Sequence, residues 1–433
     1  MRPARDLESQ VGIEYYLSET DGVGGRLRDR PEDFRVREIE DFGTEPIDAS
    51  ADAYPWLVLR VTLTSRDTND FARELANRLS ISRERVDWAG TKDKRAITTQ
   101  LFTVRGIDPN GLPTVEGATI EVVGRAGRGL YFGDLLGNDF EIVVREPEAP
   151  ERAGTITREL ADRFGGRPGV PNAFGHQRFG SYRAITHEVG FAILREDWEA
   201  AVFSYLGSPS PHEPEDSRRA REFVEKTRDW TAALDQFPNR LRYERTMLHA
   251  LAAGADFREA IETFPENLKR LFVNAAQSAI FNTILSRRLE ASVPFHEPVA
   301  GDVVAFAAEN AAELPLSDQD RTQRVTAKRV SVMARHAERD RAFVTAPLLG
   351  TETEFASGEP GEIERDVADE YDLDRAAFDL PEPFGSTGTR RAILLRVDPA
   401  ISQDPLTFEF SLPKGSYATA LLREYLKISP LEL

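Results

Sequence analysis

The feature that most constrains the fold is a change of residue pattern near residue 168 that is reversed near residue 391. Up to residue 167, apolar and polar residues alternate in short runs, which predicts strands at 34–38, 56–64, 119–124 and 140–145. A helix is expected at 70–79, capped by Thr68. Strand character returns at 392–397 and 406–412, before a terminal helix at about 416–427. We therefore predict an α+β domain with an antiparallel sheet, made of residues 1–167 and 391–433.

The interrupting segment, residues 168–390, is predicted to be a mostly helical insertion. Helical periodicity marks residues 184–195, 198–205, 217–234, 241–253 and 267–289. Short strands are expected at 303–306 and 342–345, among loops rich in proline, glycine and acidic residues. The last forty or so residues would then return to complete the first sheet.

Composition excludes several classes of protein. The chain of 433 residues has no cysteine, so disulfides and thiolate metal sites are excluded and a cytoplasmic location is expected. Its six histidines are scattered without metal-ligand spacing, and we expect no metal site. No apolar run reaches eighteen residues and the start has no signal-peptide character, so no membrane association is expected. We also expect a monomer.

The net charge of −18 is unevenly distributed. Only seven of the 55 basic residues are lysine, and an acidic, lysine-poor surface suits concentrated salt, where self-repulsion is screened. An ordinary acidic protein from a mesophile is the alternative. Five arginines crowd one N-terminal segment, whereas residues 351–374 hold ten acidic residues and one arginine. This pattern indicates a basic cleft in an acidic body. The N-terminal arginines are Arg26, Arg28, Arg30, Arg35 and Arg37.

One carboxylate, Asp93, lies on a predicted tight loop between strands at 86–89 and 97–104. Gly90 permits a sharp turn there, because glycine reaches backbone angles closed to other residues. Nearby cations favour the ionised form of a carboxylate, which can then act as a nucleophile or a base. The same cations would attract a phosphate backbone. For this stretch alone, a solvated turn is the favoured interpretation. The adjoining cations are Lys92, Lys94 and Arg95.

Three other segments combine amide or aromatic residues, which can contact a nucleoside, with glycine or proline, which are typical of loops. In residues 137–140, Asn138 could hydrogen-bond a pyrimidine edge and Phe140 could stack on a base, or they could be a turn residue and a core residue. Residues 171–180 are dense in aromatic, glycine and amide residues, which suits a domain junction as well as a binding loop. Residues 410–419 form a strand, a turn and a helix start that could receive a phosphate or simply cap the helix.

Taken together and in this order, the segments resemble the TruD family of tRNA pseudouridine synthases. The matching stretches are Pro-Glu-Asp-Phe-Arg-Val (31–36), Ala-Gly-Thr-Lys-Asp-Lys-Arg-Ala-Ile-Thr (89–98), Gly-Asn-Asp-Phe (137–140), residues 171–180, residues 345–350 and residues 412–419. The resemblance implies a pseudouridine synthase core with a mixed, largely antiparallel sheet, interrupted by the TRUD insertion domain, with a cleft for RNA between them.

The resemblance also implies roles for individual residues. Asp93 matches the catalytic aspartate, and the substrate would be tRNA, with uridine 13 the usual target and no cofactor required. RNA-contact candidates are Lys92, Lys94, Arg95 and Arg178. The positions that match the uridine pocket are Phe34, Asn138, Phe140 and Tyr417.

Two other functions are compatible with parts of the sequence. A non-catalytic RNA-binding or chaperone protein would need the cations and aromatic residues but not the acid. A carboxylate-based nuclease or phosphohydrolase would need clustered acids that hold Mg²⁺, whereas the sequence neighbours of Asp93 are cationic.

Overall fold

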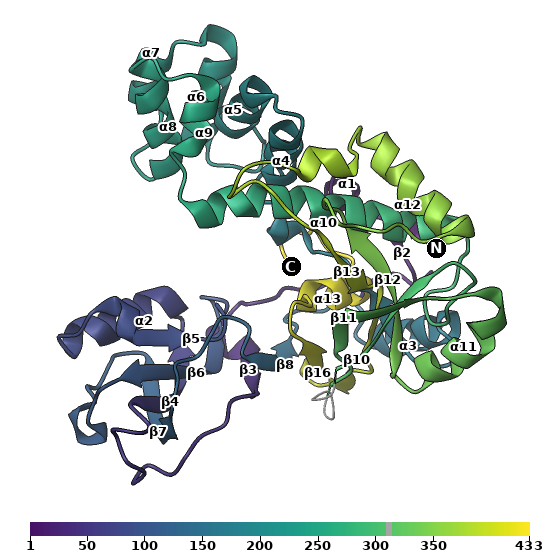
Figure 1. Cartoon of the computed structure of the whole chain (residues 1–433), viewed down its shortest axis with the longest axis horizontal. Coiled ribbons are helices and arrows are strands. Elements are labelled where there is room, and N and C mark those ends of the chain that lie inside the picture. Colours follow the sequence, from purple (N-terminus) through teal and green to yellow (C-terminus); the bar gives the residue numbers. More distant parts are fainter. Residues whose placement is uncertain (309–313) are drawn as a thin grey trace.

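An eight-stranded sheet organises the molecule, in a computed structural model that describes residues 1–308 and 314–433. Its strands β3 and β6 are parallel, and the other neighbours are antiparallel, so the sheet is mixed and largely antiparallel as expected (Figure 1). The strand order is β15 (Ala400–Gln403), β16 (Leu406–Pro413), β8 (Leu135–Val143), β3 (Phe34–Glu40), β6 (Ile97–Arg105), β4 (Trp56–Thr64) and β7 (Ala118–Ala126), and β5 (Val86–Trp88) also pairs with β6.

Alternation along β3 gives this sheet two different faces. Phe34 and Val36 are buried on one face, whereas Arg35 and Arg37 are exposed on the other. Helix α13 (Ala418–Leu426) packs on the buried face through Tyr425, whose ring meets Phe408 of β16. Helix α3 (Arg152–Arg163) joins α13 there. Farther along the sheet, α2 (Thr68–Arg78) covers β4 and β6.

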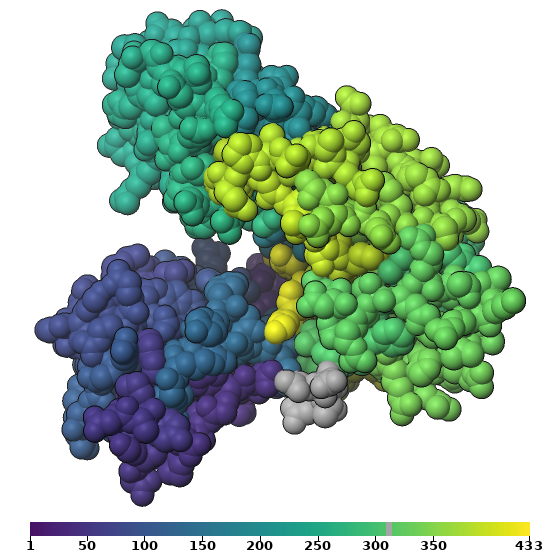
Figure 2. Space-filling model, in the orientation of Figure 1, coloured from purple at the N-terminus to yellow at the C-terminus, as the bar shows by residue number. Residues whose placement is uncertain are grey.

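The rest of the chain forms a helical bundle and a second, four-stranded sheet. Figure 1 shows α5–α9 standing away from the large sheet and joined to the molecule through α10. Figure 2 shows the surface hollowed between this bundle and the N-terminal mass that carries α2 and β4–β7. The helices are α4 (Thr186–Leu194), α5 (Trp198–Leu206), α6 (Glu215–Thr227), α7 (Trp230–Gln236), α8 (Arg242–Ala252), α9 (Phe257–Glu262), α10 (Glu266–Glu290), α11 (Val330–Glu338) and α12 (Gly358–Glu370). The second sheet has the order β11 (Ser317–Arg324), β10 (Val303–Ala307), β12 (Ala342–Leu348) and β13 (Thr389–Ala392).

The C-terminal strands return to the first sheet, because β16 pairs with β8 along seven residues. One strand crosses a proposed domain boundary, however, and one strand pairing joins the two proposed parts. β13 straddles residues 390 and 391, and β9 (Gly169–Pro171) pairs with β14 (Leu394–Arg396). The division into residues 1–167 plus 391–433 and residues 168–390 stays a proposal.

Several local predictions were wrong. The strand expected at 140–145 is the end of β8, which spans Leu135–Val143, and the strand expected at 392–397 is divided between β13 and β14. Residues 217–234 are not one helix, because α6 ends at Thr227, the next residue, Arg228, is left-handed (φ 52°), and Asp229 then caps α7. Asp67, not Thr68, caps α2 through hydrogen bonds from the backbone amides of residues 69 and 70. The acidic stretch 351–374 is not the loop that its composition predicts, because it contains α12, whose Val367 and Ala368 are buried.

Candidate active site

Asp93 lies on the loop between β5 and β6, which are antiparallel as predicted. Its side chain is 53% exposed. Gly90 is not in the left-handed region, so the turn does not depend on the special angles of glycine. A Cβ at Gly90 would lie 3.6 Å from Lys92 Nζ, which is ordinary contact. The loop must therefore be held by other interactions.

Polar side chains from three elements hold the loop. Lys92 Nζ lies 2.9 Å from Glu38 Oε2 in a nearly buried ion pair, and burial raises the pKa of Glu38 with only partial compensation by Lys92. Gln100 Nε2 donates to the Gly90 carbonyl (2.8 Å), and Thr68 Oγ1 accepts from the Lys92 amide (3.2 Å). Lys92 is thus engaged in positioning the loop, and its charge faces Glu38 rather than solvent.

The cation that contacts Asp93 is Arg28, which the sequence analysis noted only as part of an arginine-rich segment. Its Nη2 lies 3.3 Å from Asp93 Oδ2. The same guanidinium lies 4.0 Å from the ring centroid of Phe34. Arg28 has φ 57°, a left-handed conformation that is costly for a non-glycine residue and is found disproportionately at functional sites. Neither Lys92, Lys94 nor Arg95 makes an ion pair with Asp93.

A cavity of about 350 Å³ opens beside Asp93. Every residue that the resemblance placed at a uridine pocket lines it, although the four come from β3, β8 and the start of α13. The aromatic and polar lining comprises Arg28, Phe34, Thr91, Lys92, Asp93, Asn138, Phe140, Gln177, Ser416, Tyr417 and Thr419. Pockets of this size and mixed character are typical of small-ligand sites.

Asn138 brings an unpaired polar group to this cavity. Its Oδ1 is buried and has no hydrogen-bond partner among the described residues. Buried polar atoms are rarely left without a partner, so a free amide in a cavity indicates a place for a polar ligand. Gly137 explains how β8 reaches this position, since a Cβ there would lie 2.1 Å from the Leu412 carbonyl oxygen.

Three phenylalanine rings form one wall beneath the cavity. Phe140 stacks on Phe410 at 5.2 Å between ring centroids and meets the edge of Phe34 at 6.4 Å. Phe140 is only partly buried, whereas Phe34 is 1% exposed. Phe140 is therefore the ring of this wall that a ligand can reach, and Phe34 supports it from below.

The segment 171–180 fixes the opposite wall, which carries Tyr417. The Phe174 ring contacts the Tyr417 ring at 5.9 Å, and Gln177 Nε2 donates to Thr419 Oγ1 (2.8 Å). Asn282 of α10 bonds the backbone amide of Phe174 (2.8 Å). The segment is thus both a junction between the bundle and α13 and a support for the cavity, so the two readings of its sequence are compatible.

Arg391 extends this support and was not singled out from the sequence. Its Nη2 donates to Asn172 Oδ1 (2.6 Å), and its guanidinium lies 4.4 Å from the Phe174 ring centroid. Arg178 lies near the same ring, at 6.0 Å, and its Nε is buried without a partner. Neither arginine forms an ion pair with a carboxylate among the described residues.

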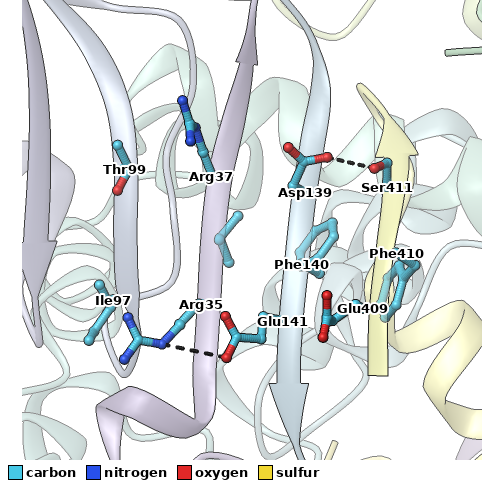
Figure 3. A pocket seen from close by; sticks show the side chains of 11 residues that line it. Arg35, Arg37, Ile97, Thr99, Asp139, Phe140, Glu141, Glu409, Phe410 and Ser411 are labelled. Atoms are coloured by element: carbon cyan, nitrogen blue, oxygen red, sulfur yellow. Dashed lines mark hydrogen bonds and ion pairs between the residues drawn. The ribbon is translucent and has the colours of Figure 1, made fainter. Parts of the chain in front are cut away.

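A larger hollow, of about 520 Å³, lies on the opposite face of the same sheet (Figure 3). Four of its polar side chains are already paired: Arg35 lies 3.9 Å from Glu141, and Ser411 donates to Asp139 (2.5 Å). Neither Asp93 nor an unpaired buried polar group lies there. We therefore take the smaller cavity as the candidate active site.

Two further findings concern the described residues as a whole. Across residues 1–308 and 314–433, no helix combines the length and apolar character needed to cross a membrane. Within the same ranges, no three His, Asp or Glu side chains gather closely enough to hold a metal ion.

Known proteins resemble this chain over its whole length. The family model for tRNA pseudouridine synthase D matches residues 10–425. A probable tRNA pseudouridine synthase D of Halobacterium salinarum is 64% identical over 434 residues, with all of both chains covered. One from Natronomonas pharaonis is 55% identical, with 99% of each chain covered. These salt-loving relatives agree with the acidic, lysine-poor composition.

A solved structure agrees with the fold as well. The crystal structure of the putative tRNA pseudouridine synthase D from Methanosarcina mazei matches with a TM-score of 0.84 and 40% identity, covering 99% of this chain and 100% of that one. Sequence similarity and fold therefore lead to the same conclusion: this chain belongs to the TruD family of tRNA pseudouridine synthases.

Proposed function

We propose that this protein converts a uridine of tRNA, with uridine 13 the expected target, into pseudouridine, and that Asp93 is the nucleophile. The observation that carries the proposal is the convergence of Asp93, Asn138, Phe140 and Tyr417 on one cavity, although they are up to 324 positions apart in the chain. Family membership supports the reaction, and the geometry supports the assignment of roles.

The reaction exchanges one bond of the ribose for another. The carboxylate of Asp93 attacks C1′, the C1′–N1 bond breaks, and its electron pair leaves with the uracil anion. The base rotates, C5 attacks C1′ and displaces the carboxylate, and the base then loses the proton on C5 and gains one on N1. An initial elimination assisted by Asp93, or attack of Asp93 on C6, uses the same carboxylate in the same place. Atoms are conserved, so the isomerisation needs no redox cofactor.

Arg28 keeps the nucleophile oriented. The Arg28 guanidinium lies 3.3 Å from the Asp93 carboxylate, and the stack of Arg28 on Phe34 fixes the direction of approach. Because the bond is single and Asp93 is half exposed, the second carboxylate oxygen stays free to react. Glu38 and Lys92 hold the loop from behind.

Asn138 and the aromatic residues hold the detached base. The N3–H of uracil can donate to the unpaired Oδ1 of Asn138, and the partly exposed ring of Phe140 lies where it can cover the base. A uridine must leave its stack to enter the cavity, which costs a few kcal/mol, and stacking on an aromatic ring offsets about 1–3 kcal/mol.

Cations around the cavity suit the RNA backbone. Lys94 and Arg95 are exposed beside Asp93 and have no carboxylate partner among the described residues, and Arg178 likewise has none. We assign these three to phosphate contacts. Lys92, which the sequence suggested for the same role, is assigned to loop positioning because of its ion pair with Glu38.

The decisive experiment compares Asp93→Asn with Asp139→Asn, an exposed aspartate on the opposite face of the sheet. Binding of tRNA and pseudouridine yield are measured together, in buffer with and without EDTA. We expect Asp93→Asn to bind tRNA and form no product, and Asp139→Asn to behave as the unmodified protein in both buffers. Turnover by Asp93→Asn would reject the nucleophile, binding without product by the unmodified protein would favour a non-catalytic RNA-binding protein, and dependence on a metal would favour a nuclease-like site.

A further inference from the structure

A turn between β7 and β8 displays two aromatic side chains to solvent. Tyr131 is 67% exposed and Phe132 is 78% exposed, the largest values among the exposed large hydrophobic residues of the described chain. We call residues 131–134 the aromatic turn. Exposed apolar rings indicate an interaction surface when the backbone that carries them is fixed by hydrogen bonds.

The aromatic turn is rigidly built. The amide of Asp134 donates to the Tyr131 carbonyl (3.0 Å), and the Tyr131 amide donates to Asp134 Oδ2 (2.9 Å). The preceding residue, Leu130, is 3% exposed, and its amide donates to Thr103 Oγ1 (3.0 Å). Gly133 adopts φ +100°, which closes the turn and which side chains rarely permit. Both rings are therefore presented at the tip of a preorganised turn.

The aromatic turn is bonded to both loops that carry the active site. The Gly133 amide donates to the Ala89 carbonyl (2.7 Å), four residues before Asp93. The Gly133 carbonyl accepts from Lys414 Nζ (2.9 Å), three residues before Tyr417. From the same turn, β8 continues to Asn138 and Phe140. The two exposed rings thus lie on a turn that is bonded to the segments leading to Asp93 and Tyr417, although neither ring lines the cavity itself.

Cations accompany the rings. The guanidinium of Arg128 lies 4.9 Å from the Tyr131 ring centroid and is ion-paired with Asp134 (2.5 Å), whereas Lys414 forms no ion pair among the described residues. Aromatic rings interleaved with cations are the combination that binds single-stranded nucleic acid, with bases stacking on the rings and phosphates meeting the cations. We propose that Tyr131 and Phe132 form a stacking platform for an unpaired base of the RNA strand next to the extruded uridine.

This proposal rests on the proposed function and adds a substrate contact outside the uridine pocket. Each aromatic side chain can bury about 150–250 Å², so the two rings together cover less than the roughly 800 Å² that each partner buries in a stable protein interface. An RNA base therefore fits this area better than a second protein does. Stacking also suits the composition. In concentrated salt, phosphate contacts lose affinity steeply, whereas contacts without charge do not.

The test uses the full-length protein and tRNA carrying 2-aminopurine beside the target uridine, in the background of Asp93→Asn so that no turnover interferes. Three variants are compared: Tyr131→Ala/Phe132→Ala, the ring-preserving Tyr131→Phe/Phe132→Tyr, and Tyr243→Ala as a control for an exposed aromatic residue on α8. Thermal unfolding verifies that each variant is folded.

We expect the double alanine variant to bind tRNA about 5- to 150-fold more weakly, the range that corresponds to losing one stacked base, and to abolish the quenching of 2-aminopurine. The slope of affinity against salt should not change, because no charge is removed. The ring-preserving variant and Tyr243→Ala should match the parent. In the active background, KM should rise while kcat at saturating tRNA stays within about twofold.

Several outcomes would overturn the platform. Unchanged affinity and quenching in the double alanine variant would do so, as would an equal loss in the ring-preserving variant. A change in oligomeric state with unchanged RNA affinity would assign the rings to self-association instead. Failure of the proposed function shows differently, as absence of pseudouridine with the unmodified protein, and the binding and quenching measurements do not depend on that product.

Discussion

The polar groups at the two ends of helix α13 differ in how far they are hydrogen-bonded within the protein. In its C-terminal half, Arg423 and Glu424 are buried and bonded to each other (2.7 Å), and Arg423 also bonds Glu8. The Glu424 carboxylate accepts from the Leu17 amide (3.0 Å), and Lys427 Nζ bonds the carbonyl and hydroxyl of Ser18. These charges fasten the N-terminal segment to the last helix.

At the other end of α13, polar groups lie in a cavity without such partners. Asn138 has an unpaired buried oxygen, and Asp93 has one ion pair at 3.3 Å. The C-terminal end has satisfied most of its own polar atoms, with Arg423 Nη2 the one left unpaired there among the described residues, whereas the cavity end leaves a bond for a ligand. Buried polar groups without partners destabilise a fold, so groups left free in a cavity are informative about function. Breaking each end should therefore affect a different property.

The largest effect on stability is expected at the paired end. Arg423→Ala leaves Glu8 and Glu424 buried without their cation, and breaking a buried ion pair in this way costs about 3–5 kcal/mol. Urea unfolding measures the loss. Tyr417→Ala at the cavity end is the control and should lose much less, because Tyr417 is only partly buried. Equal losses in the two variants would contradict the contrast between the ends.

The largest effect on activity among these changes is expected from Arg28→Gly, which should leave stability nearly unchanged. This change removes the ion-pair partner of Asp93. Because glycine adopts φ 57° without strain, the free energy of unfolding should change by less than about 1 kcal/mol. The kcat should fall about 10²–10³-fold, the range for losing one electrostatic contact in an active site. Single-turnover kinetics measure it. Arg28→Lys should recover part of the activity, and Arg35→Ala on the opposite face of the sheet should leave activity unchanged.

Asn138→Val should separate stability from activity in the opposite direction. Valine suits a strand and removes the unpaired buried oxygen, so the free energy of unfolding should stay the same or rise by up to about 1 kcal/mol. Loss of the uracil contact should lower kcat/KM by roughly 10- to 100-fold. Urea unfolding and steady-state kinetics test both parts. A clear loss of stability would show that Asn138 supports the fold rather than a ligand.

The smallest effect concerns acid stability near the start of β3. Hydrogen bonds from Arg145 hold the pKa of Asp33 below its usual range. Such a carboxyl adds stability above its unfolded-state pKa of about 3.9, and this contribution is lost as pH falls through the lower folded-state value. Asp33→Asn should therefore be less stable than the unmodified protein at neutral pH, and the difference should shrink below about pH 4. A difference that stays constant across this range would reject the assignment.

Local pattern was enough to predict many elements and failed where the fold supplies the information. The strand at 56–64 was predicted with the bounds of β4, because alternation, β-branched residues and a polar boundary all agree there. The sequence predicts α6 and α7 as one helix, because no glycine or proline interrupts the helical periodicity there. The break between them is the left-handed backbone of Arg228. Local pattern predicts Thr68 as a helix cap. Its hydroxyl instead accepts from the Lys92 amide, and a bond between residues 24 positions apart cannot be seen in a local pattern.

The sequence by itself determined most strands of the large sheet, most helices, the family and the acid at the centre of the proposed chemistry, because these depend on residue type and short-range order. Only the tertiary structure decided which cation meets that acid. Lys92, Lys94 and Arg95 adjoin Asp93 in the chain, yet Lys92 turns to Glu38, and Arg28, 65 residues away, forms the ion pair. Electrostatic partners are chosen by distance in space, and that distance is set by the packing of β3 beside β6 and not by position in the sequence.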